Sequence, residues 1–166
     1  MRELAEWLQG TSFSVTIQSV SWVVPLLQSI HIVTIGVVFV SSFMIALRVL
    51  GRIRTDEPFA AVWGQFSPWL WGGLGVMAVT GGLLVVGEPV REATSLSFWM
   101  KMILLVVAVA GTALFGRSLA AAARVEFPSG AKGAAVALLV LWIAIIFLGR
   151  AIAYDVEVWG PLSPSA

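Results

Sequence analysis

The chain has 166 residues, of which 59% are hydrophobic and only 11% are charged, and its net charge at pH 7 is +1. Its few basic residues fall in short segments, which excludes a basic face for nucleic acid. The absence of cysteine excludes disulfide bonds and thiolate-bound metals.

The first segment, residues 1–19, is predicted to form a short interfacial helix. Leu4, Trp7 and Leu8 fall on one side of a helical wheel, and the charged residues fall on the other. This amphipathic pattern is typical of a helix that lies flat at a membrane surface. Because acids stand where a signal peptide has its basic region, we expect the segment to be retained.

Four apolar stretches follow, near residues 22–47, 66–87, 97–117 and 134–154. Crossing about 30 Å of hydrocarbon takes roughly 20 apolar residues in a helix, and each stretch reaches that length. Lipid cannot satisfy backbone amides, so each stretch must be helical. The sequence therefore predicts an all-α, polytopic membrane protein. Residues 1–166 form a single four-helix transmembrane domain, with a flexible polar tail at 156–166.

The loops predict the orientation. The two loops on one side of the membrane hold six cations and three acids, against four cations and six acids on the other side. Cytoplasmic loops carry the excess of Lys and Arg, so we expect both termini in the periplasm and the chain in the bacterial inner membrane. The six cations are Arg48, Arg52, Arg54, Arg117, Arg124 and Lys132.

The 66–87 stretch is rich in glycine. Small residues allow a neighbouring helix, or a flat ligand, to approach the backbone closely. A similar small-residue face formed by Ala108, Thr112 and Gly116 strengthens the helix-packing interpretation, while a cofactor slot stays open as the alternative. The glycines are Gly72, Gly73, Gly75, Gly81, Gly82 and Gly87.

His31 is the only histidine, and it lies in a charge-free stretch from Val20 to Leu47. An ionisable residue at that depth, about 12 Å below the helix end, is a functional hypothesis by default. The alternative is a neutral imidazole bonded to a Ser, a Thr or a carbonyl of another helix.

Further polar residues are expected in the same outer half of the bundle. They are Gln28, one turn before His31, then Arg91 after the second stretch, Lys101 in the third and Arg150 in the fourth. Lys101 and Arg150 can alternatively extend their charged ends to the membrane surface, and Gln28 can bond to a neighbouring helix.

This set of residues predicts a site for haem b. Such a haem needs a nitrogen or thioether ligand, an apolar slot, and cations near its two carboxylates. His31 can supply the ligand, the glycine-rich face the slot, and Arg150, Arg91 or Lys101 the cations. The sixth iron ligand, and the choice between electron transfer and enzymatic chemistry, stay open.

Several segments carry a family resemblance: PLLQSIH before and including His31, LRVLG from Leu47, FWMKMILL from Phe98 and GRAIAY from Gly149. Over nearly its whole length the chain resembles an uncharacterised family of small four-helix bacterial inner-membrane proteins. That family is distantly similar to the membrane domain of copper-resistance protein D and to HemJ-type protoporphyrinogen oxidases.

The resemblance implies that His31 and Lys101 match the functional histidine and lysine of the oxidases, which bind haem b. Lys101 is then the candidate catalytic residue, and Arg48 matches the arginine that closes the first helix. The oxidases have further histidines, and this chain has none, so whether it is an enzyme stays open.

Two other classes of function remain. One is a non-catalytic accessory or self-assembling subunit of a membrane complex, marked by a lipid-exposed face of small residues and the absence of a chromophore. The other is a copper or metal-ion handling protein, for which only Gln28, His31 and Thr34 stand close together. The expected partners are the lipid bilayer and either further copies of the chain or a larger membrane redox complex.

Overall fold

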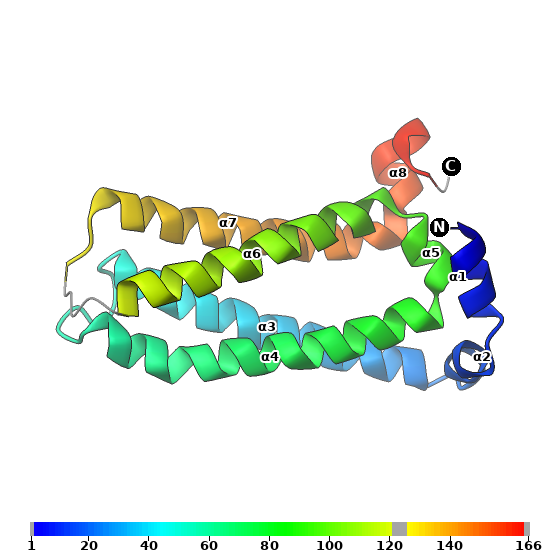
Figure 1. Cartoon of the computed structure of the whole chain (residues 1–166), viewed down its shortest axis with the longest axis horizontal. Helices are drawn as coiled ribbons and strands as arrows, with labels where there is room; N and C mark the ends of the chain where they lie inside the picture. Colours follow the sequence, from blue (N-terminus) through cyan, green and yellow to red (C-terminus); the bar gives the residue numbers. More distant parts are fainter. Residues whose placement is uncertain (1, 121–125, 165–166) are drawn as a thin grey trace.

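The computed structural model describes residues 2–120 and 126–164, so Arg124 lies outside the described residues. The described part is all-helical, as expected. Four helices run side by side and are long and apolar enough to cross a membrane (Figure 1). The chain is therefore a multi-pass membrane protein. The four are α3 (Val23–Val49), α4 (Phe59–Gly87), α6 (Leu96–Ala120) and α7 (Ser129–Ala151).

Short helices gather at the end of the bundle that holds both termini, here called the terminal end (Figure 1). The connections 50–58 and 126–128 lie at the opposite end, the loop end. The short helices are α1 (Arg2–Gln9), α2 (Ser12–Ser19), α5 (Pro89–Ala93), η1 (Ile152–Tyr154), α8 (Asp155–Trp159) and η2 (Gly160–Leu162).

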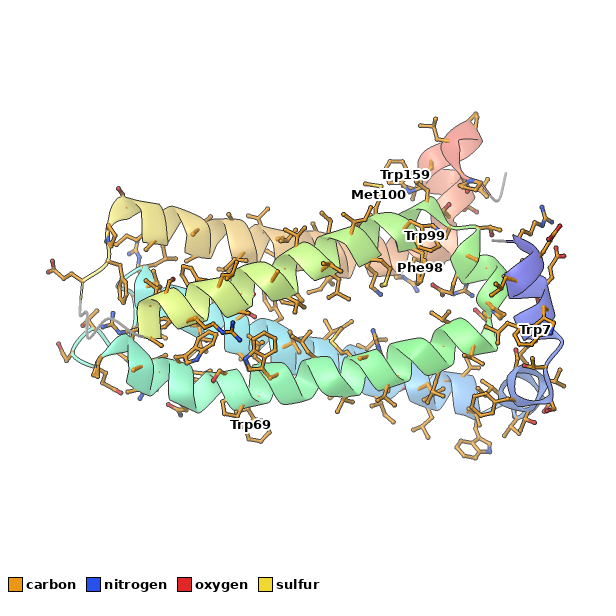
Figure 2. All side chains as sticks on the ribbon, viewed as in Figure 1. Trp7, Trp69, Phe98, Trp99, Met100 and Trp159 are labelled. Atoms are coloured by element: carbon orange, nitrogen blue, oxygen red, sulfur yellow. The ribbon has the colours of Figure 1, made fainter. Side chains whose placement is uncertain are left out.

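The N-terminal segment forms two helices rather than one. Thr11 separates them, because its hydroxyl accepts a hydrogen bond from the Ser14 amide and caps α2. Ser14 then donates to the Val86 carbonyl of α4 at 2.7 Å and ties α2 to the bundle. Leu4 and Trp7 stay 69% and 70% exposed, and Figure 2 shows Trp7 at this end of the molecule.

Two long helices begin earlier than the apolar stretches predict. Helix α4 starts at Phe59, because Phe59 and Val62 are completely buried and extend the packed surface of the helix. Pro68 lies within this helix. A proline within a membrane helix is tolerated where neighbouring groups compensate for the lost bond. Helix α7 starts at Ser129, directly after Pro128.

The segment predicted as a flexible tail from residue 156 contains α8 and η2 up to Leu162. Buried Asp155 organises it. Its carboxylate accepts hydrogen bonds from the Ser95 and Ser163 hydroxyls at 2.8 and 2.6 Å and from the Ser97 amide at 2.9 Å. It thereby caps the first turn of α6, where a negative charge is favourable.

Candidate functional site in the terminal half of the bundle

His31 lies two turns into α3 and is half-buried. Its Nδ1 is 2.8 Å from the hydroxyl oxygen of Thr80 on α4. The Thr80 hydroxyl also donates to the Val76 carbonyl of its own helix at 2.9 Å. Its single proton is then used, so it accepts a hydrogen bond from Nδ1–H. We assign the proton to Nδ1 from this hydrogen-bond geometry, and in that tautomer Nε2 keeps a lone pair.

Gly81, next to Thr80, makes room for the imidazole. A Cβ atom at Gly81 would lie 3.3 Å from Cε1 of His31, tighter than ordinary contact. The backbone of α4 thus approaches the histidine ring directly. The Nε2 atom forms no hydrogen bond within the described residues, and it is the atom that can bind a metal or exchange a proton.

The other glycines of α4 divide into two groups. Gly73 faces α3, where an added Cβ would lie 2.7 Å from a Val38 methyl group. Gly72, Gly75 and Gly82 face outward into open space. The inward glycines therefore allow α3 and α4 to pack closely, as the packing interpretation predicts. They add no open space beside His31 for a flat ligand.

Lys101, in the second turn of α6, is half-buried against α7. A Cβ atom at Gly149 would lie 3.5 Å from its Nζ, so the lysine side chain lies along the α7 backbone. Its charge interacts with both His31 and Glu92. No hydrogen bond joins Lys101 to His31 within the described residues, and the role of the pair stays a prediction.

Glu92 is a member of this site that the sequence analysis did not single out. It belongs to α5, is only 9% exposed, and forms no side-chain hydrogen bond within the described residues. Burial raises the pKa of its carboxyl, and the charges of Arg91 and Lys101 offset part of that rise. Nothing in the sequence marks it, because α5 is a single turn between two long helices.

The remaining predicted site residues lie on the surface of the terminal end. Arg150 is exposed and donates to the Tyr154 hydroxyl at 3.1 Å, with its guanidinium 5.1 Å from the ring centre. Arg91 is exposed and pairs with Glu88. Gln28 is exposed on the outer face of α3. The structure does not bring these three side chains to His31.

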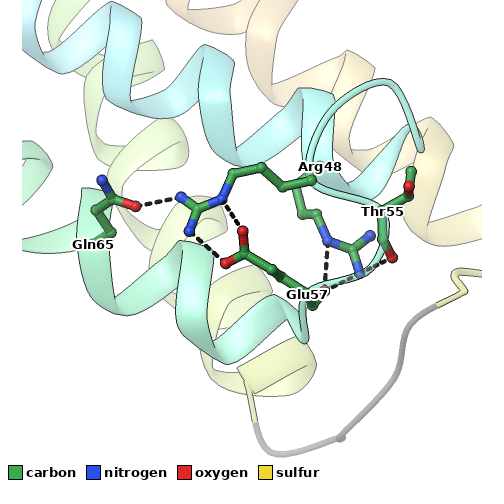
Figure 3. A network of polar contacts seen from close by, with 5 residues as sticks. Arg48, Thr55, Glu57 and Gln65 are labelled. Atoms are coloured by element: carbon green, nitrogen blue, oxygen red, sulfur yellow. Dashed lines mark hydrogen bonds and ion pairs between the residues drawn. The ribbon is translucent and has the colours of Figure 1, made fainter.

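Arg48, at the other end of α3, is buried and holds the loop end together. It donates from Nε to the Glu57 carbonyl at 3.0 Å and also bonds to the Thr55 carbonyl. Figure 3 shows these bonds beside the contacts of Arg54 with Glu57 and Gln65. Its guanidinium lies 5.3 Å from the centre of the Phe127 ring. Here the arginine fixes the connection between α3 and α4.

Two cavities lie elsewhere in the bundle, and His31 lines neither. One, of about 20 Å³, lies among α3, α4, α6 and α7 in the half nearer the loop end. The other is an open groove of about 430 Å³ beside Gly36 and Trp69. Figure 2 shows Trp69 pointing outward from α4.

The described residues contain no group of three or more His, Cys, Asp or Glu side chains placed to hold a metal ion. This finding supports neither the copper prediction nor the iron prediction. Comparison of the chain with models of known protein families, with curated proteins and with solved structures finds no match. The functional argument therefore depends on the geometry of the site itself.

Proposed function

We propose that this protein binds haem b in the terminal half of its bundle, with Nε2 of His31 as an iron ligand. The observation that carries the proposal is the hydrogen bond from His31 to Thr80. A ligating histidine commonly donates its other ring N–H to an acceptor, which fixes the tautomer and the ring orientation. The same bond is expected of a neutral histidine that only joins α3 to α4, so the absorption spectrum is the measurement that separates the two roles.

The chain supplies one histidine ligand, and neither cavity described above reaches it. No second histidine exists in the chain, so any sixth ligand comes from another residue type or another copy. The cations Lys101, Arg91 and Arg150 all belong to the terminal end, where haem carboxylates would meet water. Bound haem would supply a one-electron redox centre. We therefore propose a role in electron transfer or oxidoreductase chemistry, with Lys101 as the candidate catalytic residue.

The absorption spectrum of the detergent-purified protein tests this function. We expect reduced-minus-oxidised bands typical of a b-type haem, lost in His31→Ala and retained in the matched control Gln28→Ala. Thr80→Val removes the acceptor for Nδ1 and should weaken haem binding by roughly 10- to 100-fold, as loss of an outer-shell partner does. A colourless wild-type protein, or full haem content in His31→Ala, contradicts the proposal.

A second candidate function, assembly with further subunits, is favoured by the outer face of α4. Gly64, Gly75, Ala78 and Gly82 recur at helical spacing, and all are exposed. Added Cβ atoms at these three glycines would meet nothing within 4 Å. Such a face of small residues lets another membrane helix approach closely. We propose that a second copy of this chain can pack here.

Crosslinking in membranes tests this assembly. Gly75→Leu places a bulky side chain on the small-residue face, so we expect the crosslinked dimer to decrease at least several-fold. Ala110→Leu enlarges an exposed small residue on α6 and serves as the matched control. Equal dimer yields in both variants would count against the α4 face as an interface.

A further inference from the structure

Three buried polar atoms in the other half of the bundle have no hydrogen-bond partner among the described residues. They are Oγ of Ser42 on α3, Oγ1 of Thr112 on α6 and Nε1 of Trp142 on α7. These residues are 8%, 5% and 3% exposed. Since buried polar groups are almost always satisfied, three unpartnered atoms in one region need an explanation.

Other buried hydroxyls in α3 and α4 behave differently. Thr34, Ser41 and Thr80 each donate to the carbonyl four residues earlier, at 2.7 to 2.9 Å. That bond satisfies a hydroxyl inside its own helix. Ser42 and Thr112 do not form it, so their hydroxyls remain available to a group that lies between helices.

The three unpartnered side chains all line the cavity of about 20 Å³ among the four long helices. A cavity needs roughly 10–15 Å³ of volume accessible to the centre of a water molecule in order to hold one. This cavity is therefore large enough for a single water molecule. The rest of its lining is apolar and includes Ile45, Leu70 and Leu139.

The chemistry of the lining selects a neutral ligand. The indole N–H of Trp142 can only donate, whereas the hydroxyls of Ser42 and Thr112 can donate or accept. An anion would find donors but no charged residue in the lining to offset its loss of hydration. A cation would be repelled by the indole proton of Trp142, which points its partial positive charge at the ligand. A water molecule can accept from Trp142 and bond to both hydroxyls, the three bonds usual for buried water.

We propose that one water molecule is bound at this point and joins α3, α6 and α7 through Ser42, Thr112 and Trp142. This site is separate from His31 and independent of the haem proposal. The water links the α3–α4 pair to the α6–α7 pair by hydrogen bonds within the membrane-spanning part of the bundle.

Nuclear magnetic resonance of protein labelled with 15N in its tryptophan indoles tests the site in membrane-mimetic nanodiscs. The spectrum of Trp142→Phe identifies the Trp142 signal among the eight tryptophans. We expect a cross-peak between the Trp142 indole proton and a long-lived water molecule. The absence of that cross-peak in the folded wild-type protein overturns the proposal.

Two neighbouring serines provide the matched control. Ser42→Ala removes a proposed water ligand and should reduce the water cross-peak at least two-fold or shift the indole signal. Ser41→Ala removes a hydroxyl that bonds within its own helix. It should leave the water cross-peak and the position of the indole signal unchanged. Xenon entering the wild-type cavity would show a dry apolar space and would also overturn the proposal.

Discussion

At the scale of single residues, two ionisable groups at the terminal end differ in their hydrogen bonding. His31 is fixed by a hydrogen bond to Thr80. Glu92 is buried without a side-chain hydrogen bond in the described part of the chain, and only the charges of Arg91 and Lys101 favour its ionised form. A carboxylate in that position destabilises the fold when it is ionised, because burial removes its hydration.

We expect Glu92→Gln to stabilise the protein at pH 7. Because the pKa of Glu92 is raised in the folded state, the folded state binds its proton more tightly than the unfolded state does. The cost of burying the carboxylate is therefore present at high pH and disappears as the pH falls through the raised pKa. The gain at pH 7 should be on the order of 1 kcal/mol, as for favourable single substitutions.

Thermal unfolding in detergent at pH 7 and pH 4 measures this effect. The difference between Glu92→Gln and the wild type should shrink at pH 4. Glu88→Gln is the control, because Glu88 forms a partly exposed ion pair with Arg91, and exposed pairs contribute roughly 0–1 kcal/mol. A lower unfolding temperature for Glu92→Gln at pH 7 would show that the ionised carboxylate stabilises the fold.

At the scale of helices, close approach is controlled by small residues at particular positions. Gly116 on α6 lies against the Trp63 ring of α4, and an added Cβ would lie 2.1 Å from its Cη2 atom. Ala108 and Thr112 on the same face are also buried. The small-residue face of α6 is therefore a packing surface, as the sequence predicts.

Gly116→Ala should destabilise the protein by about 1–3 kcal/mol, because the Trp63 ring must move away from a packed position. Gly133→Ala in α7 is the control: its added Cβ meets nothing within 4 Å, and alanine favours helix by up to about 1 kcal/mol. Unfolding temperatures of the two variants should move in opposite directions. An unchanged temperature for Gly116→Ala would mean that Trp63 is free to shift.

The sequence predicts several ends of the long helices to within a few residues. It does not predict where the short helices lie. The stretch near 22–47 corresponds to Val23–Val49, and the stretch near 97–117 lies inside Leu96–Ala120. Helices α5 and α8 were not predicted. Asp155 holds α8 against the start of α6, and its serine and amide partners lie up to 60 residues away in the chain.

At the scale of the whole molecule, both described chain ends lie at one end of the bundle (Figure 1). We propose that this terminal end faces the periplasm and the loop end the cytoplasm of a bacterial inner membrane. The natural chain has no cysteine, so single engineered thiols can report the orientation without background.

Glu3 and Asp56 are exposed at opposite ends of the bundle. In cells with a permeable outer membrane, a membrane-impermeant maleimide should label Glu3→Cys. It should label Asp56→Cys only after the inner membrane is permeabilised. In intact cells, the extent of labelling should differ at least several-fold between the two variants. Labelling of Asp56→Cys alone in intact cells would reverse the orientation.

The sequence by itself determined the number of membrane helices, because helical hydrogen bonds are local and the thickness of the bilayer sets the length of each apolar stretch. The tertiary structure alone decided which residues meet. Helices α3, α4, α6 and α7 are apolar around most of their surface, and lipid is as apolar as a neighbouring helix. Hydrophobicity therefore does not fix the rotation of each helix. Packing of small residues and polar contacts fixes this rotation. It places Thr80 beside His31 and brings Ser42 and Trp142 to one cavity.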